Sequence, residues 1–178
     1  MPILTTHVAK NKGAIEQAIL SHPAVGEASV VGIPDEMKGH LPFAFIQPKK
    51  ASLLSSPSSS AAVKEQPLPA IPPPELFKEI NDAVRSQIGA IASLGGIIQG
   101  KGMIPKTRSG KTLRRVLREL VENAVLKGDY EARVNVPPTV EDAEAVEVAR
   151  ARVREYFEGI KEKNESRIEP SERTKAKL

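Results

Sequence analysis

The chain has 178 residues, of which 40% are hydrophobic and 27% are charged, so it is long enough and apolar enough to form one folded domain with a tail. Aromatic residues make up only 3% and cysteine is absent, which argues against a base-stacking nucleic-acid surface and excludes a disulfide framework, a thiolate metal site and a cysteine nucleophile. The formal net charge is +4, and no run approaches the ~20 apolar residues of a membrane-spanning helix. We therefore expect a cytoplasmic protein, with the mitochondrion as the alternative compartment, that has no metal site and no membrane partner.

The positive charge is concentrated in one short segment. From Lys101 to Arg118 there are seven basic residues and no acidic residue, whereas the rest of the chain has 19 basic and 22 acidic residues. A cluster this compact suits a small anionic ligand better than a long polyanion. Its members are Lys101, Lys106, Arg108, Lys111, Arg114, Arg115 and Arg118.

The first part of the chain predicts a helix followed by two strands. Apolar residues recur at helical spacing over residues 13–21, and Pro23 ends that helix. The β-branched run 27–33 and the apolar run 41–46 are typical of strands. The stretch between them contains proline and glycine, which are typical of a turn.

A change of composition marks residues 51–74, where six serines and six prolines fill half of the positions. This composition is typical of an extended linker, and the segment is too long for an ordinary turn. We interpret it as an insertion within a domain that spans residues 13–126.

The second half of the domain predicts a helix, a short strand, a loop and another helix. Apolar residues from Phe77 to Ile88 follow the spacing of an amphipathic helix, for which Gly89 is the expected end. Residues 95–99 are a short apolar run that we expect to form a strand. The loop 101–111 is dense in glycine and cations, and the apolar stripe after it predicts a helix that starts near Lys111.

One further helix is predicted after the prolines at 137–138, over residues 139–163. Thr139 can cap this helix, and the acidic residues Glu141 and Asp142 in its first turn suit the helix dipole. Its apolar stripe indicates docking on the domain or a solvated terminal helix, with pairing to a partner as the alternative. We expect residues 164–178 to be a flexible tail. The order of elements predicts an α+β domain with a small sheet packed against helices, plus an appended C-terminal helix.

The loop that ends at Lys111 is the strongest candidate for a functional site. Gly110-Lys111-Thr112 resembles the end of a nucleotide-binding P-loop, but the first glycine of that motif would fall on Pro105, which has no N–H to donate to a phosphate. A nucleic-acid or nuclear-localisation patch is a second interpretation, which the apolar stripe and the scarcity of aromatic residues argue against. A basic, solvated helix face without a ligand is the third.

The sequence Pro105-Lys-Thr-Arg-Ser-Gly-Lys-Thr-Leu-Arg-Arg115 is the most specific of five stretches that together resemble one family. It resembles the C-terminal signature of AMP-forming acyl-CoA synthetases, in the AMP-binding enzyme superfamily, and above all their acetyl- and propionyl-CoA synthetase branch. Among these the propionyl-type enzymes are the most similar. The resemblance covers residues 13–126 except for the insertion. The other four stretches are Ile15–Val25, Val30–Gly39, Pro42–Ile46 and Val84–Ala92.

This resemblance implies a two-step reaction. A carboxylate and ATP first give an acyl-adenylate and pyrophosphate, and CoA then gives acyl-CoA and AMP as the small C-terminal domain rotates on the large domain. Lys111 matches the catalytic lysine of the first step, where an ammonium on a glycine-supported loop can reach both the carboxylate and the α-phosphate. Gly110, Arg108 and Arg114 would lie against phosphate beside it, and Arg85 matches an arginine that contacts a phosphate of CoA. The alternative role for the arginines is helix solvation.

Several departures from the family pattern limit this implication. The sequence has neither the Ser/Thr/Gly-rich ATP loop nor the carboxylate pocket of the large adenylation domain. We therefore expect the chain alone to be inactive and to need that domain as a partner, with ATP and CoA as substrates of the complete enzyme. Residues 1–12 would be a remnant of the hinge. Lys10-Asn-Lys-Gly13 replaces a Gly-His-Arg-like stretch beside the path of the CoA thiol, and Gly89-Ala90 replaces the usual Gly-Pro.

A second functional hypothesis comes from a different class of protein. The basic loop and the C-terminal helix could form a non-catalytic regulatory or binding module for a protein or nucleic-acid partner, although the low aromatic content argues against nucleic acid. From the sequence, the chain could be a truncated gene product, a split-off domain or a non-catalytic regulator.

Overall fold

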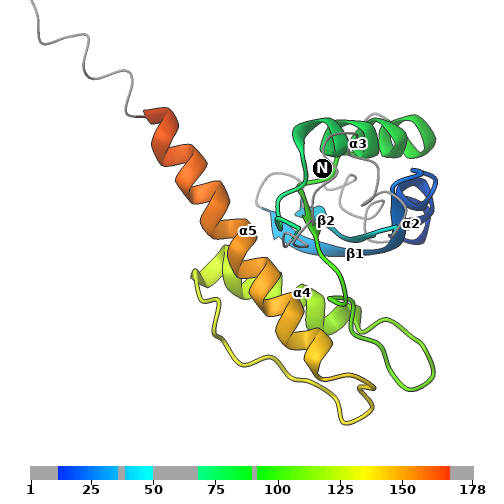
Figure 1. Ribbon diagram of the computed structural model, residues 1–178, viewed down its shortest axis with the longest axis vertical. Helices are drawn as coiled ribbons and strands as arrows, with labels where there is room; N and C mark the ends of the chain where they lie inside the picture. The colour runs from blue at the N-terminus through cyan, green and yellow to red at the C-terminus, as the bar shows by residue number, and fades with distance from the viewer. Residues whose placement is uncertain (1–11, 36–38, 50–67, 90–91, 169–178) are drawn as a thin grey trace, which may run out of the picture.

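The computed structural model describes residues 12–35, 39–49, 68–89 and 92–168. Figure 1 shows their arrangement along the chain. The elements are α2 (Lys12–Leu20), β1 (Val25–Asp35), β2 (Gly39–Pro48), α3 (Pro74–Ile88), β3 (Gly96–Gln99), α4 (Arg114–Glu122), the π-helical turn η2 (Asn123–Lys127) and α5 (Glu144–Ile168).

The three strands form one sheet in the order β1-β2-β3. β1 and β2 pair antiparallel, with Val31 opposite Phe43. β2 and β3 pair parallel, with Phe43 opposite Gly96, and α3 lies in the crossover that a parallel pair requires. Because helices cover both faces, the centre of β2 is buried continuously over residues 42–46 rather than at alternate positions.

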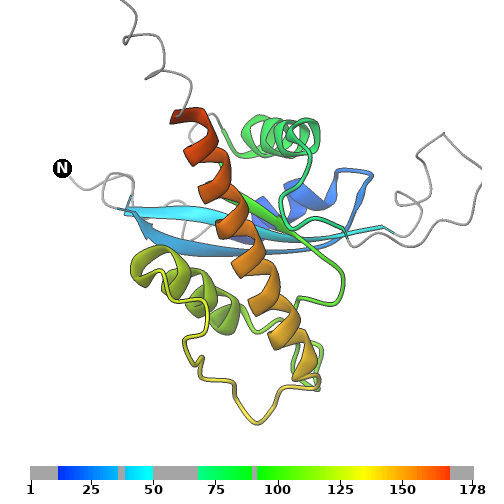
Figure 2. The same ribbon diagram turned by 60° about the vertical axis from the view of Figure 1, so that its left-hand side comes forward.

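The sheet separates two apolar clusters. Ala44 and Ile46 point into the cluster formed with α2 and α3, whereas Phe43 and Phe45 point into the cluster formed with α4 and α5. Figure 2 shows the same layers, with α2 and α3 on one side of the sheet and α4 on the other. The predicted α+β architecture with a small sheet is confirmed.

The C-terminal helix α5 docks on the domain through the stripe that its sequence predicts. Its buried residues are Ala145, Val146, Ala149, Val153 and Tyr156. The ring of Phe43 lies 6.1 Å from that of Tyr156 and 5.9 Å from that of Phe157, measured between centroids. Gly96 permits this close approach, because a Cβ atom there would overlap the Phe43 ring and the Tyr156 hydroxyl.

Two predicted helix boundaries are wrong. The helix expected near Lys111 begins at Arg114, because Thr112 is still paired with Lys106 in a β-bridge. The helix expected over residues 139–163 spans Glu144–Ile168 instead. Thr139 therefore caps no helix, and the Asp142 carboxylate accepts the Glu144 N–H at 2.9 Å and satisfies one of the free amides of the first turn.

Other expectations fall wholly or partly outside the described residues. These are the hinge remnant, most of the Ser/Pro-rich insertion and the last ten residues of the predicted tail. The described end of the insertion, residues 68–73, lies against α5, where the Ala70 N–H donates to the Glu155 carboxylate at 3.0 Å. Across the described residues, no helix has the length and apolar character to cross a membrane.

Candidate functional site

The signature loop folds into a short hairpin. Lys106 and Thr112 form an antiparallel bridge, and the Thr107 N–H donates to the Lys111 carbonyl at 2.9 Å. The turn is closed by the Gly110 N–H, which donates to the Thr107 carbonyl at 2.8 Å. Gly110 has a φ of +78°, a left-handed conformation that strains any residue with a Cβ atom. The sequence therefore places glycine where the turn requires it, immediately before Lys111.

The first support at the base of the hairpin is an ion pair. The Lys106 amino group lies 2.7 Å from the Glu27 carboxylate on β1. The backbone closes the same end, because the Leu113 N–H donates to the Pro105 carbonyl at 2.8 Å. The hairpin is thus attached to the edge of the sheet where it leaves the domain.

The second support at the base is Arg114, the first residue of α4. Its guanidinium donates to both oxygens of the Glu16 carboxylate, at 2.9 Å and 2.7 Å. Glu16 is 7% exposed and also accepts the Val30 N–H of β1 at 2.8 Å, so this one carboxylate joins α2, β1 and α4. Hydrogen bonding to Glu16 raises the pKa of Arg114 above its ordinary value, while desolvation acts in the opposite direction. The structure thus places the predicted phosphate ligand Arg114 in a carboxylate pair.

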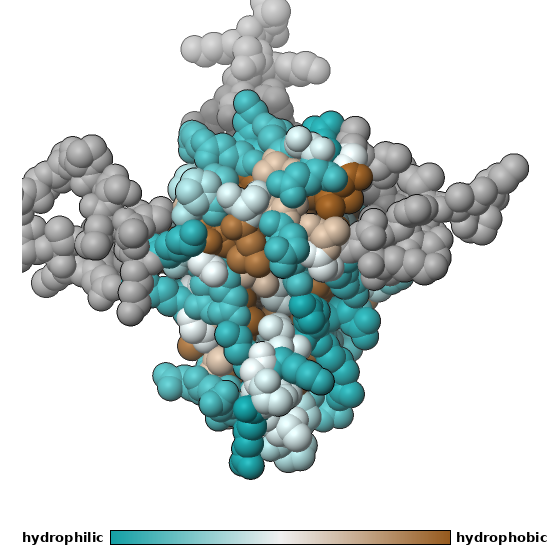
Figure 3. All heavy atoms as spheres, turned by 90° about the vertical axis from the view of Figure 1, so that its right-hand side faces the viewer, coloured by the Kyte–Doolittle hydropathy of each residue, from teal (hydrophilic) through white to brown (hydrophobic). Residues whose placement is uncertain are grey.

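The tip of the hairpin differs from its base. Residues 108–111 are exposed. Among the described residues, no carboxylate lies within 4 Å of the side-chain nitrogens of Arg108 or Lys111. The hairpin projects at the lower right of Figure 1, and the lower part of that side is mostly hydrophilic to intermediate in Figure 3. Lys111, Gly110 and Arg108 therefore form one solvent-facing cationic tip.

Arg85 lies apart from this tip. It is an exposed residue in the last turn of α3, where its carbonyl accepts the Gly89 N–H at 3.0 Å. α3 and α4 cover opposite faces of the sheet, as Figure 2 shows. The structure therefore brings Lys111, Gly110 and Arg108 together but leaves Arg85 on the other face.

The comparison with protein families decides what this domain is. Residues 14–111 match the model of the AMP-binding enzyme C-terminal domain. The chain belongs to this family. The match ends at Lys111 itself and includes Arg85, so both residues lie inside the matched region rather than in the appended helix.

Relatives in the same family are acetyl-coenzyme A synthetases. The chain is 38% identical to that of Campylobacter jejuni over 144 residues, which are 81% of this chain and 19% of the relative. It is 37% identical to that of Pyrobaculum aerophilum over 141 residues, which are 79% of this chain and 17% of the relative. A solved acyl-CoA synthetase from Brucella canis is 31% identical, with a TM-score of 0.48, over 66% of this chain and 18% of that one. The chain thus spans about a fifth of the length of the relatives it matches.

Sequence reasoning missed the carboxylates that hold the hairpin. Glu16 follows Ile15 directly and lies within the apolar stripe of the first helix, and a buried acid at such a position needs a cationic partner. That requirement is the signal that could have pointed to Arg114. The ion pairs also change the interpretation of the basic segment, because Lys106, Arg114 and Arg118 are paired with Glu27, Glu16 and Glu122. The resulting surface does not favour the alternative of a basic binding module.

Proposed function

We propose that this chain acts as the C-terminal domain of a short-chain, propionyl-type, AMP-forming acyl-CoA synthetase and supplies Lys111 for formation of the acyl-adenylate. The observation that carries the proposal is the exposed Lys111 at the tip of a hairpin whose neighbouring cations Lys106 and Arg114 are held by carboxylates. A cation without a carboxylate partner can move to an anionic substrate without first breaking an ion pair.

The first step joins two anions, and this gives Lys111 its role. An oxygen of the carboxylate attacks the α-phosphorus of ATP, the bond to the β-phosphate oxygen breaks, and pyrophosphate leaves. The ammonium of Lys111 draws both anions together and stabilises negative charge that develops between them. Arg108 and Gly110 would lie beside the phosphates, with Gly110 allowing close approach of the backbone.

The second step would use the other face of the domain. The thiol of CoA loses its proton as its sulfur attacks the adenylate carbonyl, and AMP leaves with acyl-CoA as the product. Arg85 would contact a phosphate of CoA, and it lies on the α3 face, opposite the α4 face. Use of different faces of the domain in the two steps is in keeping with a rotation of the domain between them.

The proposal includes an adenylation domain as partner. The residues at the hairpin tip are exposed, so they enclose neither ATP nor a carboxylate by themselves. Catalysis of the first step depends on holding these two substrates together. We therefore propose that the 178-residue chain is inactive until an adenylation domain docks against it.

The experiment measures propionyl-CoA formation from ATP, propionate and CoA. The chain is assayed alone, then with a separately expressed adenylation domain from a propionyl-type synthetase, and then with one from an acetyl-type synthetase. We expect no product from the chain alone and product from both mixtures. Each rate is expressed as a fraction of the rate of the intact synthetase that supplied the adenylation domain, and this fraction should be larger for the propionyl-type mixture. Product from the chain alone, or none from any mixture, would contradict the proposed function, whereas equal fractions in the two mixtures would contradict the propionyl assignment only.

A further inference from the structure

The segment that connects η2 to α5 returns to the base of the Lys111 hairpin. We call residues 129–143 the return segment. It lies outside residues 14–111, to which the family match is confined. Its apolar residues Val134, Val136 and Val140 are half-buried and pack against the core cluster between the sheet, α4 and α5. Val134 and Val136 turn the same face inward, and a turn closed by the Val140 N–H, which donates to the Pro137 carbonyl at 3.1 Å, then brings Val140 to the hairpin.

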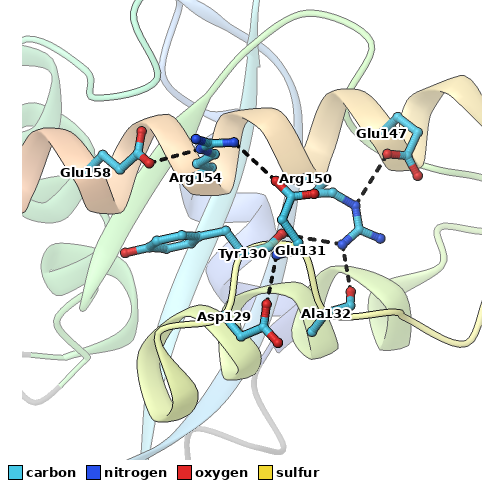
Figure 4. Close-up of polar contacts among 8 residues, drawn as sticks. All are labelled: Asp129, Tyr130, Glu131, Ala132, Glu147, Arg150, Arg154 and Glu158. Atoms are coloured by element: carbon cyan, nitrogen blue, oxygen red, sulfur yellow. Dashed lines mark hydrogen bonds and ion pairs between the residues drawn. The ribbon is translucent and has the colours of Figure 1, made fainter.

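Two arginines of α5 hold the beginning of the return segment, as Figure 4 shows. The Arg150 guanidinium donates to the Ala132 carbonyl at 2.6 Å and to the Tyr130 carbonyl at 3.4 Å. Arg154 forms an ion pair with Glu131 at 3.1 Å. Since α5 is itself anchored in the core, these contacts fix the path of the segment relative to the domain.

The end of the return segment pairs with the hairpin. Thr107 and Val140 form an antiparallel bridge. The Glu141 N–H donates to the Lys106 carbonyl at 2.9 Å, and the Arg108 N–H donates to the Thr139 carbonyl at 3.2 Å. Residues 139–141 therefore extend the hairpin by one antiparallel bridge with two backbone hydrogen bonds, on the side opposite Thr112.

This added bridge has a physical consequence for Lys111. An isolated hairpin is marginally stable in water, and pairing with a segment that packs on the core, as Val140 does, makes it more ordered. A catalytic group misplaced by about 1 Å can lose on the order of 100-fold in rate. The ammonium of Lys111 stands on an exposed turn, so its placement depends on the order of the hairpin beneath it.

We propose that the return segment is a positioning element for Lys111: residues 139–141 complete the hairpin, and α5 holds them in place through Arg150. This inference rests on the proposed function of Lys111 in adenylation. It assigns a role in the same reaction to the appended helix and its connection.

The test replaces the backbone donor at position 141. Glu141→Pro removes the N–H that donates to Lys106, and Glu141→Ala is the matched control because it keeps that N–H. Hydrogen exchange is then followed at the amides of Thr107 and Gly110, whose bonds lie within the hairpin and not in the return segment. We expect faster exchange at both amides in Glu141→Pro and unchanged exchange in Glu141→Ala. Unchanged exchange in both variants would overturn the inference.

Activity supplies the second readout, as propionate-dependent exchange of pyrophosphate into ATP in the mixture with an adenylation domain. We expect Glu141→Pro to lower kcat about tenfold with KM values little changed, because the loss is one of positioning rather than of binding. An unchanged kcat would overturn the inference. A wild-type mixture without activity would contradict the proposed function instead, and the exchange result would still decide whether the return segment orders the hairpin.

A second variant covers the case in which Glu141→Pro does not fold. Arg150→Met keeps the aliphatic stem but removes the donors to Ala132 and Tyr130, and Glu147→Gln is its control because it removes only the Arg150–Glu147 ion pair. We expect Arg150→Met to speed hydrogen exchange in the hairpin and to lower kcat by less than Glu141→Pro does. Equal behaviour of Arg150→Met and Glu147→Gln in both readouts would overturn the role of α5.

Discussion

The tip and the base of the hairpin carry similar charges but have opposite surroundings. At the base, Lys106 and Arg114 are engaged by Glu27 and Glu16, which fix the hairpin to the sheet and to α2. At the tip, Lys111 is exposed, and its amino group has no carboxylate within 4 Å among the described residues. The sequence presents all three as one basic segment, yet the structure divides them into cations that hold the loop and a cation that is presented by it.

This comparison teaches that charge density along the sequence does not tell which cations hold the fold and which are free for chemistry. The position of each cation relative to the sheet makes that distinction. A carboxylate partner lowers the availability of a cation for a ligand and at the same time holds the backbone around it. The base and the tip should therefore respond to substitution in different measurements, stability for the base and activity for the tip.

The largest expected effect is on activity, at the tip. Lys111→Ala should lower the adenylation rate by about 100- to 1000-fold, the size expected when a preorganised charge-stabilising group is lost. It should leave the urea unfolding midpoint unchanged, because the side chain has no carboxylate partner within 4 Å among the described residues. The rate is measured as pyrophosphate exchange in the mixture with an adenylation domain, and Lys161→Ala, in the exposed part of α5, is the control. Equal rates in the two variants would remove Lys111 from the mechanism.

The next effect is on stability, at the base. Glu16→Ala should lower the free energy of unfolding by about 2 kcal/mol, less than for a fully buried pair because the Arg114 side chain is 47% exposed. The change leaves the Val30 N–H and the Arg114 guanidinium without their acceptor. Glu122→Gln is the control. Its partner Arg118 lies at i,i+4 spacing on the surface, so loss of this ion pair should lower the free energy of unfolding by less than about 0.5 kcal/mol. Urea unfolding followed by circular dichroism measures the stability of both variants. Equal losses of stability would contradict the role of Glu16 in holding the base of the hairpin.

A smaller effect separates the turn from ordinary glycine positions. Gly110→Ala should destabilise the chain by about 1 kcal/mol, because Gly110 has a φ of +78°. Gly13→Ala should stabilise it by a few tenths up to about 1 kcal/mol, because Gly13 lies in α2 and alanine is the better helix former. Among the described residues, a Cβ atom at either position meets nothing within 4 Å beyond its neighbours along the chain, so the backbone conformation is the difference between them. Unfolding curves that move in the same direction for both variants would contradict this account of the turn.

The smallest effect at neutral pH concerns Tyr156, through which α5 packs on the core. Burial raises the pKa of Tyr156 above its ordinary value of 10.0, while a hydrogen bond with the Ile97 backbone acts in the opposite direction. The folded state therefore favours the neutral phenol. Its contribution to stability is fully present below the unfolded-state pKa and is lost as the pH rises through the raised folded-state pKa.

Tyr156→Phe tests this pH dependence, because phenylalanine cannot ionise. Urea unfolding of both chains at about pH 8 and about pH 11 should show a larger loss of stability on going to high pH for the wild type than for the variant. Tyr130 is present in both chains and cancels in the comparison. Parallel losses in the two chains would show that Tyr156 does not titrate from a buried site.

Much of the fold could be predicted because its signals are local. The apolar periodicity of α3 and α5 and the β-branched runs of β1 and β2 each lie within a single element, and the glycine at 89 ends α3 as expected. The starts of α4 and α5 could not be predicted, since each follows a β-bridge that the helical pattern does not show: Lys106–Thr112 before α4 and Thr107–Val140 before α5. Thr107 and Val140 form a bridge across 33 positions, and no local preference of Thr139 or Val140 announces it.

In the candidate site, too, the features with a local signal in the sequence were predictable and those that depend on distant residues were not. Gly110 and Lys111 are marked by a specific motif in the chain itself, so their place at one tip follows from the sequence. Whether Arg114 meets a phosphate or a carboxylate depends on Glu16, which is 98 positions away. An ion pair between distant elements, of which only the acid is buried, leaves a weak trace in the sequence, namely an acid within an apolar stripe.

The central claim is that this chain presents Lys111 to the acyl-adenylate, and lysine labelling tests it most directly. The chain is treated with an amine-reactive reagent, alone and in the presence of an adenylation domain with bound propionyl-adenylate, and the modification rate of each lysine is measured by mass spectrometry. We predict that Lys111 reacts readily in the free chain and is protected in the complex, while Lys161 reacts equally in both. Equal reactivity of Lys111 in the free chain and in the complex would contradict the claim.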